Sequence, residues 1–115
     1  MDKAAWIRER VQRDLEDPGS HEVRWSAHAV REILNDGLTG REVEKALLQC
    51  ELVEDYPTET RPLPDCLVLG RLRDGRPVHV VVALDEVRAR ILVVTVYIPS
   101  GGYWHADWQT RRRGE

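Results

Sequence analysis

A stripe of apolar residues at helical spacing marks the first element of the chain: Ile7, Val11 and Leu15. The stripe predicts a helix over residues 3–16. The loop at residues 17–20 ends this helix, because its proline and glycine interrupt helical geometry. We therefore assign residues 1–20 to an N-terminal helix and linker, and residues 21–115 to one α+β domain.

A short extended piece at residues 23–25 leads into a second helix. Ser26 has the side chain preferred at a helix N-cap, and the helix is expected to run to Asn35. Gly37 follows as a stop signal. The residues expected to face the core share helical spacing: Ala27, Val30, Ile33 and Leu34.

A third helix is expected directly afterwards. Thr39 and Glu42 have the spacing of a capping box, in which two side chains satisfy free backbone N–H groups at a helix start. The residues that this helix is expected to bury follow a helical repeat: Val43, Ala46, Leu47 and Cys50.

After residue 50 the pattern changes from a helical to an extended period. Strands are predicted at residues 52–56, 66–72, 78–84 and 90–98. Pro57 ends the first strand, and the last strand is the most apolar and is expected at the centre of the sheet. The order of elements predicts an α+β fold with a mainly antiparallel sheet of four to five strands and two helices packed on one face. The extra N-terminal helix is expected either to cover the second face of the sheet or to occlude the groove of the site.

The dipeptide Asp74-Gly75 predicts a hairpin with a two-residue turn. Such a turn pairs Gly70 with His79, and since paired residues share a face, no side chain then stands beside the imidazole. Arg71 projects to the opposite face in this register. Two interpretations of His79 stay open: a residue of the core or its boundary, packed under the N-terminal helix, or a residue open to a groove.

Composition indicates a globular chain without an excess of positive charge. Of the 115 residues 42% are hydrophobic and 32% are charged, the net charge is −3, and the isoelectric point is about 5.8. A dedicated nucleic-acid binder usually carries a clear basic excess, so composition argues against a simple RNA-binding role. We expect no membrane span and no signal peptide. Cys50 and Cys66 lack metal-ligand spacing and predict reduced thiols in a cytoplasmic protein.

Several polar and aromatic residues together predict an anion site. His28 and Arg31 lie at a helix start, where backbone N–H groups attract anions. Tyr97 follows at the end of the last strand. The residues expected to bind substrate are Arg71, His79, Trp104, Arg111 and Arg112. Each has a structural alternative, since such side chains also serve as solvated charges or as anchors of a C-terminal segment.

The order of elements and a set of short motifs resemble a bacterial family of small proteins grouped with RelE/ParE-like toxins, near the BrnT and MqsR types. The motifs are Ser26-x-His28, the strand at 67–69, Asp74-Gly75, Thr95-Val96-Tyr97-x-Pro99 and the segment from Trp104 to Arg112. The resemblance covers residues 23–112. It implies a RelE-like domain that acts as the cytoplasmic toxin of a type II toxin–antitoxin system. The implied partner is a small cognate antitoxin that carries a zinc finger.

The resemblance also implies RNA cleavage without a metal or another cofactor. In this reaction the 2′-OH attacks its own phosphodiester, which requires a base, an acid and nearby cations. His28, Arg31 and Tyr97 are the residues expected to carry it. Relatives commonly have an arginine four residues after the histidine and another four residues later, where this chain has Glu32 and Asp36. Because acids there repel a phosphodiester, cleavage is expected to be weakened or lost.

Two other functions stay open. The first is a non-catalytic interaction module that forms a homodimer or binds a partner through the sheet edge and the aromatic C-terminal segment. The second is a hydrolase or a small-ligand binder on the same scaffold. It is the least favoured, because the sequence shows neither a nucleophile–base pair nor a Gly-rich phosphate loop.

Overall fold

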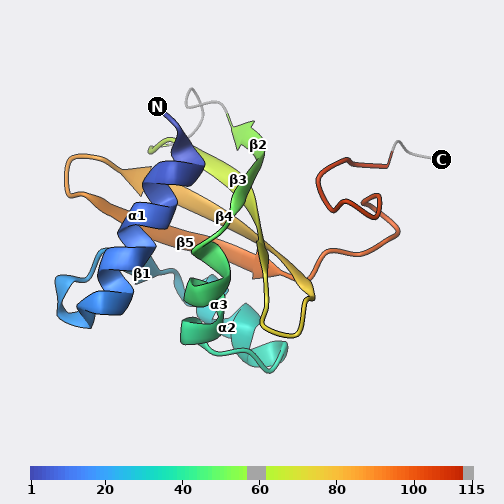
Figure 1. Cartoon of the computed structure of the whole chain (residues 1–115), viewed down its shortest axis with the longest axis horizontal. Helices are drawn as coiled ribbons and strands as arrows, with labels where there is room; N and C mark the ends of the chain where they lie inside the picture. Colours follow the sequence, from blue (N-terminus) through green and yellow to red (C-terminus); the bar gives the residue numbers. More distant parts are fainter. Residues whose placement is uncertain (57–61, 113–115) are drawn as a thin grey trace.

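The computed structural model describes residues 1–56 and 62–112, and in these residues three α-helices pack against a five-stranded sheet (Figure 1). The elements are α1 (Lys3–Glu16), η1 (Pro18–Ser20), β1 (Val23–Trp25), α2 (Ala27–Asn35), α3 (Gly40–Leu47), β2 (Glu51–Tyr56), β3 (Asp65–Arg71), β4 (Pro77–Asp85) and β5 (Arg90–Tyr97). The predicted α+β class is confirmed. Pro57 lies outside the described residues, so the expectation that it ends the strand at residues 52–56 stays a prediction.

The sheet is mixed, with the strand order β1-β5-β4-β3-β2. Neighbouring strands are antiparallel except for β1, which pairs with β5 in parallel through residues 23–25. The central strand is therefore β4, and the prediction that the last strand is central is wrong. β5 is nevertheless an internal strand with β1 and β4 on its two sides, which agrees with its apolar sequence.

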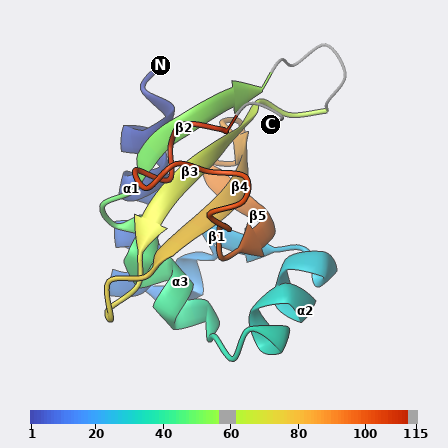
Figure 2. The ribbon, with the colours of Figure 1, turned by 90° about the vertical axis from the view of Figure 1, so that its right-hand side faces the viewer.

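Helices α1 and α3 lie on one face of the sheet, which we call the helix face. Ile7 and Val11 of α1 are fully buried in the same core as Val43 of α3 and Val80 of β4. The C-terminal segment, residues 98–112, lies on the opposite face, and Figure 2 shows this tail in front of the strands with α1 behind them. We call this the tail face. The N-terminal helix thus covers the helix face, contrary to the expectation that it covers the second one.

Helix α2 lies against the edge of β5 that β1 leaves unpaired. Ser26 caps the helix as predicted, since its hydroxyl oxygen accepts a hydrogen bond from the N–H of Ala29 at 2.9 Å. A carboxylate oxygen of Glu32 accepts from the N–H of Val96 at 2.8 Å and from the hydroxyl of Thr95 at 2.6 Å. These bonds satisfy strand groups that would otherwise be unpaired at the sheet edge.

The predicted core side of α2 is only partly correct. Ile33 is buried, but Ala27 and Val30 are exposed and Leu34 is 69% exposed. The helix instead buries Ala29 beside Ile33. The anchoring of Glu32 on β5 explains the difference, because it turns the helix so that the side of residues 29, 32 and 33 faces the sheet.

Helix α3 follows its prediction closely. The capping box of Thr39 and Glu42 is present, and the predicted apolar residues are buried: Val43, Ala46, Leu47 and Cys50. Cys50 and Cys66 are both buried free thiols. Burial raises the pKa of Cys50 to about 11 and that of Cys66 to about 12, so both stay protonated at neutral pH.

The β3–β4 hairpin differs from its prediction by one residue. Leu72 donates its N–H to the carbonyl of Arg76 at 2.9 Å, which leaves residues 73–75 as a three-residue loop. Gly75 has φ +90°, the left-handed conformation that such a loop requires. The pairing is therefore Leu69 with His79, and a shift of one residue moves a side chain to the other face of a sheet.

Gly70 lies where α3 comes closest to the sheet. A Cβ atom at this position would lie 2.7 Å from the carbonyl oxygen of Ala46. Because this backbone cannot move away without shifting α3, we expect Gly70→Ala to lower the free energy of unfolding by about 3 kcal/mol. Gly101→Ala is the control, since a Cβ there meets no atom within 4 Å. Equal urea-unfolding midpoints for the two variants would contradict this packing.

Glu44 of α3 contacts Asp14 of α1, and burial together with the Asp14 charge raises the pKa of Glu44 to about 7. The folded protein thus binds a proton on the Glu44 carboxyl more tightly than the unfolded chain does, where the pKa of this group is 4.5. The contribution of protonated Glu44 to the free energy of unfolding is complete below pH 4.5 and is lost as the pH rises through 7. We expect Glu44→Gln to raise the melting temperature at pH 8 and to leave it almost unchanged at pH 4. Glu86→Gln, at an exposed position, should change neither value.

Candidate functional site

The tail face carries a polar cluster that two β-bulges assemble. The register of β2 shifts between Leu52 and Glu54, and that of β5 shifts opposite Val81 and Val82. Each bulge inserts one residue and so reverses the alternation of the residues that follow it. As a result Glu54 and Tyr97 lie on the same face as His79.

His79 lies in the middle of this cluster and is fully buried. Its strand partners are Leu69 on β3 and Tyr97 on β5. The tail covers the imidazole, and the ring of Trp104 meets it edge-on at 4.4 Å between ring centroids. The predicted pairing with Gly70 is therefore wrong, and of the alternatives for His79 the place under the N-terminal helix does not apply. The interpretation of His79 as a buried residue is correct.

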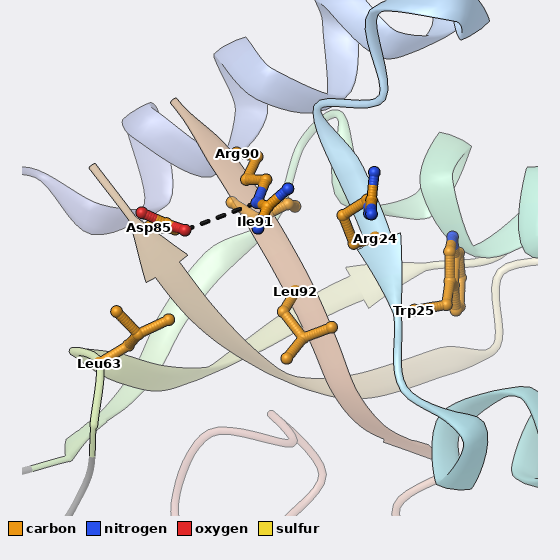
Figure 3. Close-up of a pocket in the computed structure, with 7 residues that line it drawn as sticks. All are labelled: Arg24, Trp25, Leu63, Asp85, Arg90, Ile91 and Leu92. Atoms are coloured by element: carbon orange, nitrogen blue, oxygen red, sulfur yellow. Dashed lines mark ion pairs between the residues drawn. The ribbon is translucent and has the colours of Figure 1, made fainter. Parts of the chain in front are cut away.

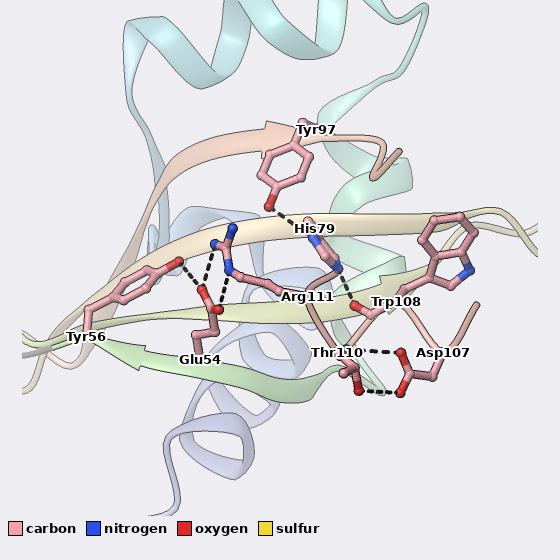
Figure 4. Close-up of polar contacts among 8 residues, drawn as sticks. All are labelled: Glu54, Tyr56, His79, Tyr97, Asp107, Trp108, Thr110 and Arg111. Carbon is pink, nitrogen blue, oxygen red and sulfur yellow. Dashed lines mark hydrogen bonds and ion pairs between the residues drawn. The ribbon is translucent and has the colours of Figure 1, made fainter. Parts of the chain in front are cut away.

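Both ring nitrogens of His79 have hydrogen-bond partners, as Figure 4 shows. Nε2 lies 2.6 Å from the carbonyl oxygen of Trp108, and Nδ1 lies 3.0 Å from the hydroxyl oxygen of Tyr97. A carbonyl only accepts, so Nε2 carries the proton. In the neutral ring Nδ1 is then an acceptor, and the Tyr97 hydroxyl donates to it. The tail backbone thus selects the tautomer whose free lone pair faces Tyr97.

Burial shifts both groups toward their neutral forms. It lowers the pKa of His79, where the nearby Arg111 charge acts in the same direction and the bond to Trp108 opposes it. Burial also raises the pKa of Tyr97. At neutral pH the pair is therefore a neutral imidazole that accepts from a phenol, the arrangement of a base beside a proton donor.

Arg111 brings a guanidinium group to the same face. Its Nε and Nη2 donate to the two carboxylate oxygens of Glu54 at 2.5 and 2.9 Å (Figure 4). The guanidinium also lies over the ring of Trp104, 4.6 Å from the ring centroid. The bonds from Arg111 lower the pKa of Glu54. Tyr56 donates to Glu54 as well, and burial and this bond raise the pKa of Tyr56 to about 12.

The tail is held in place by its own hydrogen bonds. Trp104 and Arg111 pair as an antiparallel bridge, and Asp107 accepts from the backbone N–H groups of Gln109 and Thr110. The guanidinium of Arg112 donates to the carbonyls of Gly101 and Trp104. Arg112, a predicted substrate ligand, therefore binds the tail backbone in this structure.

His28 and Arg31 do not take part in the hydrogen bonds of this cluster. His28 is exposed on α2, and its Nε2 lies 3.4 Å from a carboxylate oxygen of Glu32. Glu32 in turn holds the edge of β5, whereas the hydroxyl of Tyr97 points to His79 under the tail. The structure thus brings Tyr97 together with His79, Trp104 and Arg111. It joins His28 to Glu32 instead, and Arg31 stays exposed.

Arg71 lies at the end of β3 and is exposed. It pairs with Pro77 at the end of the hairpin. With Glu42 and Lys45 it lines a shallow hollow beside α3. In residues 1–56 and 62–112, no group of three His, Cys, Asp or Glu side chains is placed to hold a metal ion.

A family model described as a domain of unknown function (DUF4258) matches residues 25–98. The chain belongs to this family. The DUF4258 segment contains both His79 and Tyr97 but ends before Trp104, so the tail that covers the pair lies outside it. Searches of the curated proteins and of the solved structures find no match. No helix among the described residues is long and apolar enough to cross a membrane.

Sequence reasoning missed three members of the cluster in this DUF4258 protein: Glu54, Tyr56 and Trp108. The first two lie in a short strand whose bulge has no signal in the pattern of apolar residues. Trp108 contributes through its carbonyl group, which every residue possesses. Its left-handed conformation, φ 59°, is unusual for a tryptophan and is not marked in the sequence.

Proposed function

We propose that this protein is a toxin-like endoribonuclease of a type II toxin–antitoxin system, with its catalytic residues on the tail face. The observation that carries the proposal is the hydrogen bond of 3.0 Å from Tyr97 to a His79 ring whose tautomer is set by Trp108. Arg111 adds a cation beside the pair. A cognate antitoxin with a zinc finger is the proposed partner, on the strength of the resemblance in residues 23–112.

The pair has the chemistry that metal-independent RNA cleavage needs. The Tyr97 oxygen would take the proton of the 2′-OH while its own proton moves to Nδ1 of His79. The 2′-oxygen would bond to the adjacent phosphorus as the bond from phosphorus to the 5′-oxygen breaks, and the departing 5′-oxygen would take a proton from water. Arg111 would stabilise the developing negative charge on the phosphate. Glu54 weakens this stabilisation, because its carboxylate already pairs with the guanidinium. For this reason we propose that RNA cleavage is slow and becomes faster when the tail moves away from Tyr97 and His79.

Two measurements test the proposal on the full chain. Induced expression should arrest bacterial growth, and the purified protein should cleave single-stranded RNA in the presence of EDTA to leave 2′,3′-cyclic phosphate ends. A protein that does neither, at concentrations where it is folded, would contradict the proposal.

A second candidate function is a non-catalytic interaction module. Val30 is 39% and Leu34 69% exposed on one side of α2, one turn apart. Large apolar side chains that share an exposed helix side are typical of a contact with another protein. A homodimer in light scattering, combined with inertness toward RNA, would favour this second function.

A further inference from the structure

A hollow of about 280 Å³ opens on the outer side of β5, at the end away from the tail (Figure 3). Its walls carry the side chains of Arg24 on β1 and Arg90 on β5. Leu92 and Leu63 add apolar side chains to its lining. The volume is close to the lower limit of ligand pockets, roughly 300 Å³, so the hollow suits a ligand of about one nucleotide.

The charges around the hollow favour an anion. Asp85 is the acid at its rim, and it is already paired with Arg88 at 3.1 Å and with Arg90 at 3.5 Å. Arg24 is exposed and has no ion pair among the described residues. Its guanidinium is therefore available for a ligand, and it presents paired N–H donors that match phosphate geometry.

The hollow and the polar cluster lie on the same face of the sheet. Arg24 is the strand partner of Leu92, and the bulge in β5 places Leu92 and Tyr97 on the tail face together. Four regular strand steps separate the two residues, a distance of roughly 14 Å along β5. A nucleic-acid strand that reached Tyr97 would thus pass the hollow.

We propose that this hollow binds a nucleotide unit, with its phosphate on Arg24 and Arg90 and the flat face of its base on Leu92 and Leu63. The phosphate belongs to a free nucleotide or to a nucleic-acid strand, and both present the same group to the two arginines. The inference goes beyond the cleavage proposed above, because binding here needs neither Tyr97 nor His79.

Calorimetric titration of the full chain at low salt tests the proposal with three probes: inorganic phosphate, AMP and a short single-stranded RNA. We expect AMP to bind about tenfold more tightly than inorganic phosphate because of the apolar side chains of Leu92 and Leu63. Arg24→Gln should weaken AMP binding by about tenfold, since it removes a charged donor without removing a structural contact. RNA binding tighter than AMP binding identifies a strand as the ligand, and equal affinities identify a free nucleotide.

Arg13→Gln is the matched control. It removes the same charge from α1, which lies on the helix face. Arg13 is exposed, and its ion pair with Glu9 is long, at 3.7 Å. We expect it to change AMP affinity by less than twofold. Equal losses in Arg24→Gln and Arg13→Gln, or no AMP binding at millimolar concentration, would overturn the proposal. Tyr97→Phe should retain AMP binding, which separates this result from the outcome of the cleavage assay.

Discussion

Tyr97→Phe is expected to reduce RNA cleavage by about 100-fold, since it removes the one hydroxyl that donates to Nδ1 of His79. The ring of Tyr97 stays in place, so the fold should survive. The lost hydrogen bond leaves Nδ1 unpaired and should cost about 1 kcal/mol in the free energy of unfolding. Initial rates of cleavage, measured with EDTA on a labelled RNA, give the result directly.

Tyr103→Phe is the control for this experiment. Tyr103 is 73% exposed in the tail, and its hydroxyl has no place in the cluster. It should cleave at the rate of the unmodified protein. If Tyr97→Phe also kept that rate while the unmodified protein cleaved RNA, the reaction would not use the pair on the tail face.

Trp104→Ala is expected to lower the free energy of unfolding by about 3–5 kcal/mol, the usual loss for a buried tryptophan. Trp104 is 3% exposed and packs between the imidazole of His79 and the guanidinium of Arg111. Its removal leaves a cavity over His79 and takes away an apolar contact between the tail and the sheet. Urea unfolding followed by circular dichroism measures the effect without relying on tryptophan fluorescence.

Tyr103→Ala is the matched variant for stability, because it removes an aromatic ring from the same tail at an exposed position. We expect its free energy of unfolding to change by no more than about 0.5 kcal/mol. Similar stabilities for Trp104→Ala and the unmodified protein would mean that the tail does not cover the sheet in solution. The His79 ring would then be open to solvent, and its tautomer would no longer be set by Trp108.

Local signals in the sequence predicted the helices well. The cap at Ser26 and the capping box at Thr39 act within a few residues, so the starts of α2 and α3 could be read from neighbouring side chains. The order of elements likewise predicted the α+β class. The core side of α2 could not be read in this way, because the bond from Glu32 to β5 joins residues far apart in the chain.

The candidate site was predicted only in part. Trp104 and Arg111 were expected near Tyr97, and the structure places them in the same cluster. His28 instead contacts Glu32, and Arg31 stays exposed. Simple alternation along β5 puts Tyr97 on the same face as Ile91, which is the helix face. The bulge reverses this, and it forms only when β4 and β5 pair.

The amino-acid pattern thus determines where helices and strands begin, since propensity, caps and turn residues act over one or two helical turns. It also specifies the apolar residues that must be buried together. Which face each side chain reaches was settled by long-range pairing: the three-residue loop at Gly75, the two bulges and the folding of the tail onto His79. A shift of one residue in a strand moves a side chain across the sheet, and the free energy that selects the register comes from contacts between distant segments.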